Sequence, residues 1–387
     1  MNQPQFSNRG NGYGRSGSVM LLTLAVLCLI TAGCGMVGPK AVRSNRMDYS
    51  EALRQSNDEQ LLLNLVRLRY RDTPSFLDVG NITTQLRVEV AADAGIEQNR
   101  EFEFGEKRNN LIVTDFYRAG ISGSYSEQPT ITFSPLKGEE FIQRFLSPVS
   151  LDKIMLLYRS GWSLPKLLRV CVSRMNTLAN APRAGSSTPG KEPQYREFLR
   201  AVKIMNDLED EELLFVGYSA RTGDGGLMLR IDAEGWKKPE ARELANLLGL
   251  TPGRQEYSIR LMTMGDPPHP GVVFLETRSL LGMLAFLSNG VGVPSQDLDA
   301  GKVKMTTAAT GGTFDWGAVL GSLFKVTSGP VRPAGSAVSI RYRNNWFSIE
   351  DSDLETKATF MLVSQLFSLQ AGKTESVSPL LTLPVGR

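Results

Sequence analysis

The sequence has little histidine and cysteine, with one His and three Cys in 387 residues. Zinc and non-haem iron sites usually draw on two or more histidines or on a cysteine cluster, so metal sites of these kinds are not expected. Three cysteines also cannot build the disulfide framework of a small secreted domain. The sequence also lacks an excess of charge of either sign, because it contains 43 Lys and Arg residues and 40 Asp and Glu residues. The charge balance therefore gives no electrostatic case for nucleic-acid binding.

The composition is that of a globular protein. Apolar residues make up 41% of the chain and charged residues 21%, and the formal net charge is +3. This is too apolar and too nearly neutral for an intrinsically disordered chain. The length suggests two domains, each large enough to bury its own core. No fixed-period repeat indicates a solenoid or a propeller.

The N-terminal segment contains an apolar run that is too short to span a membrane. As a helix, residues 19–30 would reach only about 18 Å, against about 30 Å for a hydrocarbon core. A polar leader with two arginines precedes the run, and small residues up to Gly33 follow it. This order predicts a secretory signal peptide over residues 1–33.

Residues 30–34, ITAGC, resemble the lipobox of the bacterial lipoproteins, with Thr31 where that family usually has an aliphatic residue. The resemblance implies cleavage between Gly33 and Cys34, a diacylglyceryl group on the Cys34 sulfur and an acyl chain on the new amino terminus. Three acyl chains exceed the two signals that stable anchoring requires. Gly35 stands where an Asp would favour the inner membrane in that family, so the resemblance implies an outer-membrane protein facing the periplasm. The alternative is an ordinary cleaved signal with an incidental cysteine.

The remainder of the chain predicts a tether over residues 34–46 and a two-part body of α+β, or mixed α/β, class. The N-terminal α+β domain is predicted at 47–180 and the C-terminal α/β domain at 194–387. Between them, residues 181–193 are rich in Pro, Gly and Ser and predict an interdomain linker. The last fifty residues predict a unit of strand, strand, helix and strand with a tight turn at Asn344-Asn345.

Hydrophobic periodicity gives the individual elements. Helices are predicted at 48–70, 138–146, 151–160, 164–178, 194–208, 239–248, 279–287 and 352–370. Strands are predicted at 85–90, 111–116, 130–133, 213–218, 227–231, 257–262, 337–343, 346–349 and 379–385.

One short motif matches an enzyme family. Ser163-x-x-Lys166 is similar to the Ser-x-x-Lys motif of penicillin-recognising serine enzymes, in which the lysine acts on the serine hydroxyl one helical turn away. The accompanying Ser-Asp-Asn and Lys-Thr-Gly motifs are missing. The alternative, which we prefer, is that Ser163 caps a helix with Pro165 in its first turn. Ser163 and Lys166 remain the catalytic candidates if the protein is an enzyme.

The other motifs favour structural roles. His269 stands between prolines and predicts a stiff surface turn, and Cys171 lies in an apolar helix, where a small buried hydrophobe is expected. The glycine pattern at 12–17 falls inside the leader and follows no strand, and Gly372-Lys373-Thr374 lacks the first glycine of a P-loop. No nucleotide, other cofactor or metal is therefore expected.

Two further segments leave alternatives open. Arg67, Arg69 and Arg71 end the first long helix, where they predict either a solvated helix end or a contact with anionic lipid headgroups. Residues 306–321 are rich in Gly and Thr and include Phe314 and Trp316. This segment predicts a mobile loop, with a contact between protomers or with a membrane as alternatives.

Together these features favour a lipid-anchored, non-enzymatic structural or adaptor subunit of a periplasmic or outer-membrane assembly. Its expected partners are the membrane, through the anchor, and envelope proteins or further copies of the chain. A periplasmic hydrolase or transferase acting on cell-wall or lipid substrates is one alternative. A small-ligand-binding lipoprotein is the other, and it requires a roomy apolar pocket.

Overall fold

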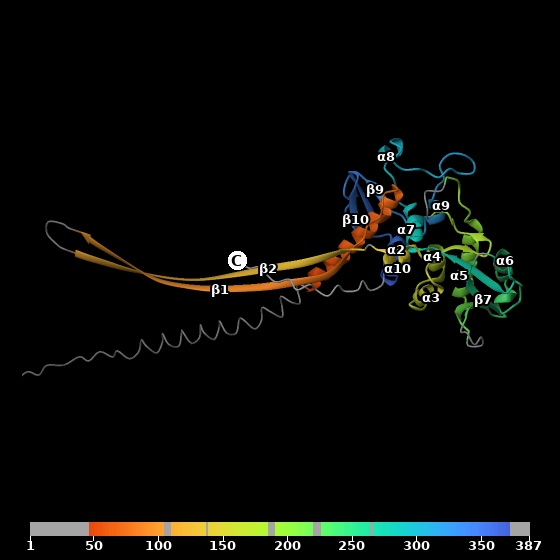
Figure 1. Cartoon of the computed structure of the whole chain (residues 1–387), viewed down its shortest axis with the longest axis horizontal. Helices are drawn as coiled ribbons and strands as arrows, with labels where there is room; N and C mark the ends of the chain where they lie inside the picture. The colour runs from red at the N-terminus through yellow and green to blue at the C-terminus, as the bar shows by residue number, and fades with distance from the viewer. Residues whose placement is uncertain are drawn as a thin grey trace, which may run out of the picture.

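The computed structural model describes residues 46–103, 110–136, 138–184, 190–219, 226–263, 265 and 267–371. The mixed α+β architecture confirms the predicted fold class. A long two-stranded ribbon projects from a body that contains the helices and the other strands (Figure 1). The predicted signal peptide, Cys34, nearly all of the tether and the strand at 379–385 lie outside the described residues.

The ribbon consists of β1 (Leu77–Glu103) and β2 (Asn110–Pro135), which pair antiparallel along their whole length. At about 3.3 Å per residue, the 27 residues of β1 extend about 90 Å. All three strands predicted between residues 85 and 133 lie in this ribbon. They are parts of one hairpin, because the polar and glycine-containing residues 91–103 and 117–129 continue as paired strand instead of turning.

The body has two hydrophobic cores. The first core lies between helices and a three-stranded antiparallel sheet of order β10-β11-β9. Its elements are the helix over residues 46–69, called the first helix below, with α2 (Glu139–Leu146), α3 (Leu151–Arg159), α7 (Leu280–Ser288), α9 (Gly317–Leu320), α10 (Leu354–Ala371), β9 (Thr327–Gly329), β10 (Ser336–Tyr342) and β11 (Asn345–Glu350).

The second core lies between two helices and a six-stranded sheet of order β4-β3-β8-β7-β6-β5. Only β7 and β8 pair in parallel, and the other neighbours are antiparallel. The elements are β3 (Val172–Met175), β4 (Leu178–Ala179), α5 (Arg196–Asp210), β5 (Leu214–Tyr218), β6 (Leu227–Ile231), α6 (Pro239–Leu248), β7 (Glu256–Leu261) and β8 (Val272–Thr277). Short helices η1 (Gly235–Lys237) and α8 (Ser295–Asp299) complete the body.

The chain passes between the two cores at α4 (Leu164–Cys171). Leu164 and Leu168 belong to the second core, whereas Leu167 and Val170 belong to the first. Residues four apart share one face of a helix, so α4 presents one apolar face to each core. The second core is therefore formed by a segment, residues 164–275, whose two ends are connected to the first core.

The division between the cores does not coincide with the predicted linker at 181–193. Strands β3 and β4 before it and helix α5 after it all contribute to the second core. The Pro-, Gly- and Ser-rich composition of residues 181–193 therefore indicates a loop and not a border between domains. Residues 185–189 of this loop lie outside the described part of the chain. Ala181 and Ala184, at its start, are buried in the first core.

Arg278 fastens the junction of the two cores. Its guanidinium donates to the backbone oxygens of Arg169 (3.2 Å), Val170 (3.1 Å) and Val172 (2.6 Å), and also to that of Asn180. Three of these carbonyls end α4, where a helix dipole favours a positive charge. The side chain also covers the Phe286 ring at 4.0 Å, and burial lowers its pKa.

Local elements differ from prediction at two places. The helix predicted at 164–178 ends at Cys171, because Val172–Met175 pairs with β8, a strand that was not predicted. The turn predicted at Asn344-Asn345 lies one residue earlier. Arg343 and Asn344 have φ of 46° and 67°, and Tyr342 pairs with Asn345, which is the geometry of a two-residue hairpin turn.

Candidate functional site at the base of the ribbon

The two predicted catalytic candidates lie at the start of α4. Ser163 is exposed and occupies the N-cap position, with Pro165 in the first turn, although its side chain makes no capping hydrogen bond. Lys166 Nζ lies 2.9 Å from Glu355 Oε2 of α10. The geometry supports a structural role for both residues, and their catalytic role stays a prediction.

The surroundings of the other two titratable candidates, His269 and Cys171, indicate structural roles. His269 is exposed, and its Nδ1 accepts a hydrogen bond from the Gly271 N–H at 3.1 Å. Cys171 is a free and fully buried cysteine, and burial raises the pKa of its thiol to about 12. Across the described ranges, His, Cys, Asp and Glu nowhere gather in a group of three or more that could hold a metal ion.

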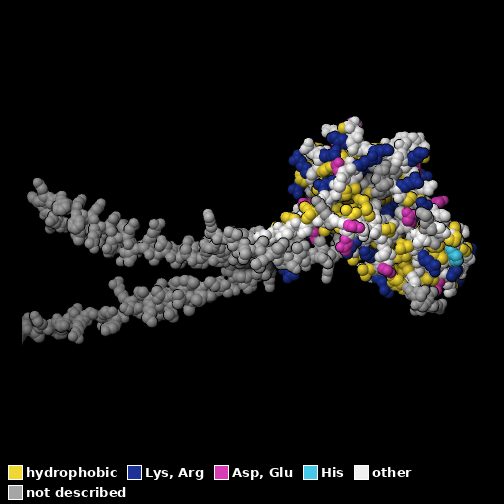
Figure 2. Space-filling model, in the orientation of Figure 1, with side chains coloured by type: hydrophobic (Ala, Val, Ile, Leu, Met, Phe, Trp, Pro, Cys, Tyr) yellow, Lys and Arg dark blue, Asp and Glu magenta, His cyan; other side chains and the backbone are white. Residues whose placement is uncertain are grey.

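Two surface interpretations from the sequence are wrong. Arg69 is 3% exposed, and Trp316 and Phe314 are 5% and 7% exposed. Trp316 Nε1 donates to Thr306 Oγ1 at 3.0 Å, so the ring belongs to the first core and does not contact a membrane. The three arginines do not form one basic surface. On the face shown in Figure 2, Lys and Arg side chains are spread over several parts of the body.

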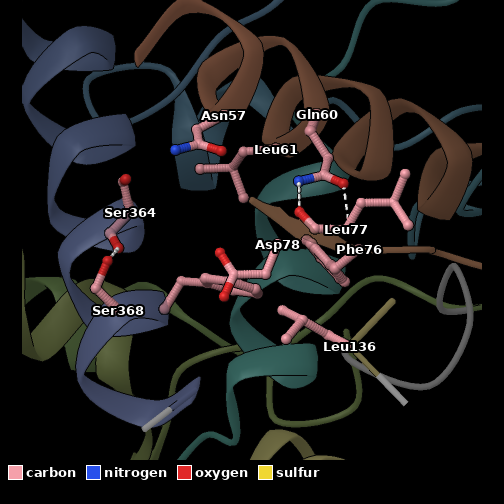
Figure 3. A pocket seen from close by; sticks show the side chains of 10 residues that line it. Asn57, Gln60, Leu61, Phe76, Leu77, Asp78, Leu136, Ser364 and Ser368 are labelled. Carbon is pink, nitrogen blue, oxygen red and sulfur yellow. Dashed lines mark hydrogen bonds between the residues drawn. The ribbon is translucent and has the colours of Figure 1, made fainter. Parts of the chain in front are cut away.

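The feature that distinguishes this molecule is the attachment of its ribbon to the body. Two amide side chains of the first helix hold the residues that lead into β1. Gln60 Oε1 accepts from the Leu77 N–H (2.5 Å) and Gln60 Nε2 donates to the Leu77 carbonyl (3.0 Å; Figure 3). One turn further along, Asn64 Oδ1 accepts from the Ser75 N–H (2.9 Å) and its Nδ2 donates to the Ser75 carbonyl (2.8 Å).

The two pairs fit because helix and strand spacings match. Residues four apart on a helix are separated by about 6 Å along the axis. Residues two apart on a strand are separated by about 6.6 Å. Gln60 and Asn64 can therefore each face one of two alternate residues of the chain leading into β1, Leu77 and Ser75. Each amide supplies the donor and the acceptor that a neighbouring strand would otherwise supply.

Phe76, between those two residues, anchors the opposite side of the chain. It is 5% exposed, and its ring lies 5.6 Å from that of Phe145 and 4.7 Å from that of Phe367. The Phe76 carbonyl also accepts from the Leu136 N–H at 3.0 Å, which joins the two ends of the hairpin. Burying such a ring contributes about 1.5–3 kcal/mol. Polar and apolar contacts thus fix the base of the ribbon on two sides. We call this arrangement of Gln60, Asn64 and Phe76 the ribbon mount.

A cavity of about 260 Å³ lies beside the ribbon mount (Figure 3). It is bounded by the first helix, the base of the ribbon and α10, and among the described residues of its lining Asp78 alone is ionisable. A nucleophile next to a general base, the usual sign of acid–base or covalent catalysis, is not found among these residues. The lining is formed by Asn57, Gln60, Leu61, Phe76, Leu77, Asp78, Leu136, Ser364, Phe367 and Ser368.

The C-terminal end of the first helix is fixed to the body by a buried polar contact. The Tyr70 hydroxyl donates to Asp297 Oδ2 at 2.6 Å, and Lys302 Nζ lies 2.5 Å from Asp297 Oδ1. Burial alone would raise the pKa of Asp297, but the hydrogen bonds from Lys302 and Tyr70 outweigh it and lower the pKa.

A second contact follows directly after the helix. Asp72 accepts hydrogen bonds from the Tyr342 hydroxyl and from Arg343 Nη2, the latter at 2.8 Å. The Arg343 guanidinium also covers the Tyr70 ring at 4.9 Å. The body therefore holds the C-terminal end of the first helix, and Gln60 and Asn64 hold the ribbon a few turns before that end.

Sequence reasoning missed the ribbon mount, although one signal was present. Asn64 is a fully buried amide between Leu62 and Val66 in the apolar stripe of the first helix. A polar residue in such a stripe requires a hydrogen-bond partner. The partner, Ser75, is eleven residues away and could not be identified from helical spacing.

The described helices include none with the length and hydrophobicity needed to cross a bilayer. Comparison of the chain with models of known protein families, with curated proteins and with solved structures finds no match.

Proposed function

We propose that this protein is a lipid-anchored structural or adaptor subunit of an assembly in the bacterial cell envelope. In this proposal Cys34 carries the lipid in the outer membrane and the body lies in the periplasm. The observation that carries the proposal is the ribbon: a strand pair about 90 Å long, firmly mounted on a folded body. A projecting element of this kind is suited to contacting partners, and the surroundings of Ser163 and Lys166 add no support for catalysis.

The ribbon is longer than the tether, which supports contacts with partners far from the point where the lipid enters the membrane. Eleven residues lie between Cys34 and the start of the first helix at residue 46. Fully extended, such a segment spans at most about 40 Å. The ribbon is more than twice as long, so it can reach partners that the anchored body itself cannot touch.

Small-ligand binding is the second candidate function, and one cavity favours it. A space of about 430 Å³ lies between the segments around residues 289–293 and 313–326. Its lining is mainly apolar and includes Phe314, Trp316 and Phe324, together with the buried Arg69. Ligand pockets are commonly apolar with a few polar groups. Native mass spectrometry of protein extracted from membranes would detect a lipid or another small molecule bound in this cavity.

The proposed structural role is tested by extracting a C-terminally tagged form from membranes in mild detergent. Light scattering then gives its native mass, and mass spectrometry identifies whatever copurifies. We expect a defined particle larger than one chain. A strict monomer without any partner would contradict the proposal.

Full biological activity of a Ser163→Ala form would remove the hydrolase or transferase alternative that depends on this residue.

A further inference from the structure

The outer edges of the ribbon have no pairing strand within the described part of the chain. β1 and β2 form a sheet of two strands only. In an antiparallel pair about half of the backbone N–H and C=O groups of each strand point away from the partner. Such a row of groups is a template for a further strand, and an isolated two-stranded hairpin is only marginally stable in water.

The edges lack several of the features that commonly prevent association. Exposed edges are protected by charged side chains, above all lysine, and by proline, β-bulges or short strand length. The charged residues of residues 87–96 and 117–126, which are Arg87, Glu89, Asp93 and Arg118, all fall on one face of the ribbon. Residues 85–103 and 110–128 contain neither proline nor lysine. The register runs unbroken from Asn81 to Glu103, and its one irregularity lies at the base, after Val79. The edges are therefore open to pairing along most of their length.

Between residues 87–96 of β1 and 117–126 of β2, the register also places most of the apolar positions on one face of the ribbon. Successive positions of a strand fall on opposite faces, and directly paired positions share a face. One face carries the pairs Val88 with Tyr125, Val90 with Gly123, Ala92 with Ile121, Ala94 with Ala119 and Ile96 with Tyr117. The other face carries Arg87 with Ser126, Glu89 with Ser124, Ala91 with Ser122, Asp93 with Gly120 and Gly95 with Arg118.

We propose that copies of this chain associate edge to edge through their ribbons, with β1 of one copy pairing antiparallel with β2 of the next. The inference names the partner within the structural role proposed above and rests on that role. The register within one ribbon already aligns these two sequences with their apolar positions on one face. Repeating it between copies gives a continuous antiparallel sheet with one apolar and one polar face. Such a head-to-tail contact closes into a ring or continues as a filament.

A second copy fits the ribbon better than a lipid surface alone. Lipid would cover the apolar face, but the edge N–H and C=O groups would remain unpaired, and hydrocarbon does not tolerate unpaired backbone groups. A second copy pairs the edges and extends the apolar face at the same time. Pairing between copies therefore satisfies the edge groups whether or not the apolar face also contacts lipid.

Cysteine cross-linking of the full-length protein tests this pairing directly. Both forms carry Cys171→Ser; one adds Ala91→Cys in β1 and the other Ser122→Cys in β2, two positions that pair within the ribbon. In a mixture of the two forms, a disulfide between them reports a contact between copies. We expect a mixed dimer several-fold above that obtained with Ser160→Cys, an exposed serine of the body. Cysteines at Ser124 and Ser126 test a register shifted by two or four residues.

The outcomes separate this inference from the proposed function. A large native particle without any mixed dimer at the three β2 positions would overturn the pairing of ribbons and leave the structural role in place. A monomer without partners would overturn both. Ribbons that bind phosphatidylethanolamine–phosphatidylglycerol vesicles as monomers, again without mixed dimer, would assign the apolar face to lipid alone and contradict the inference.

A matched pair of substitutions tests the assignment of faces. Ala91 and Ala92 are neighbours in β1 and occupy opposite faces of the ribbon. We expect Ala92→Lys, on the apolar face, to reduce the yield of mixed dimer several-fold, and Ala91→Lys to leave it unchanged. Equal effects of the two lysines would contradict an assembled sheet with one apolar face.

Discussion

The body and the ribbon satisfy their backbone hydrogen bonds in opposite ways. The six-stranded sheet of the body ends in short edges, with two residues in β4 and five in β5, and two helices pack against it in the second core. The ribbon has edges of 27 and 26 residues and no further strand within the described ranges. The body thus contains the partners that its elements need, whereas the ribbon, in our proposal, pairs with a second copy of the chain. Substitutions in the two regions should therefore affect different properties.

The largest expected effect in the body comes from Arg278. Arg278→Met would remove a donor from four backbone carbonyls, of which those of Arg169 and Val172 keep a hydrogen bond, from Asn180 Nδ2. A hydrogen bond to a charged group contributes about 1.5–3 kcal/mol of folding free energy, and Arg278 donates several. Urea unfolding followed by circular dichroism measures the loss. Arg278→Lys is the control and should lose less, because it keeps the charge. Wild-type stability of the methionine form would contradict the role of Arg278 at the junction.

A smaller effect is expected at the ribbon mount. Asn64→Ala removes both hydrogen bonds to the exposed Ser75. A hydrogen bond contributes about 0.5–1.5 kcal/mol net, so the loss of two should cost about 1–3 kcal/mol. Hydrogen exchange should show faster exchange at the Ser75 amide, whose N–H donates to Asn64. Gln55→Ala is the matched control, because Gln55 bonds only with Glu59 in the exposed surface of the same helix. Equal changes in both forms would show that Asn64 does not fix the ribbon.

The dependence of body stability on pH should involve Asp297. The pKa of Asp297 is lowered in the folded state, so its stabilising contribution is present above the ordinary Asp value of about 4. This contribution is lost as the pH falls through the lower, folded-state pKa. Urea unfolding between acidic and neutral pH measures it. Asp297→Asn should flatten the acid side of the curve, and an unchanged curve would contradict the assignment.

The smallest effect is expected at Cys171, whose thiol should not react with labelling reagents in the native protein. Burial raises the pKa of its thiol to about 12 and prevents access of reagents. A thiol-specific reagent at mildly alkaline pH should therefore label the mature protein only after unfolding, at a single thiol. More than one reactive thiol would contradict lipidation of Cys34. Incorporation of labelled palmitate, lost in a Cys34→Ala form, tests the anchor independently.

The sequence predicted those parts of the fold that depend on local patterns. The helix at 239–248 and the strand at 227–231 match α6 and β6 at both ends, because apolar spacing and turn residues define them locally. The strand β8 was missed, since its place depends on pairing with β3 about a hundred residues earlier. The full length of the ribbon was missed for a similar reason. Its polar segments are held extended by the opposite strand.

The candidate site was even less predictable. Ser163 and Lys166 were selected by a short motif, but Lys166 pairs with Glu355, nearly two hundred residues away. The ribbon mount has no motif, because two amides of one helix substitute for a strand. Its recognition required knowing which backbone groups lie opposite Gln60 and Asn64.

The central claim, that the ribbon is the element through which this protein assembles, is tested most directly by shortening it. Thr83 pairs with Thr130, so joining these residues by Asn-Gly replaces residues 84–129 with a two-residue hairpin turn and keeps the ribbon mount. Light scattering in mild detergent would compare the native mass of this form with that of the full-length protein, and circular dichroism would confirm that the body is folded. We predict that the folded, shortened form is monomeric while the full-length protein is not. A shortened form that keeps the full-length native assembly would contradict the account.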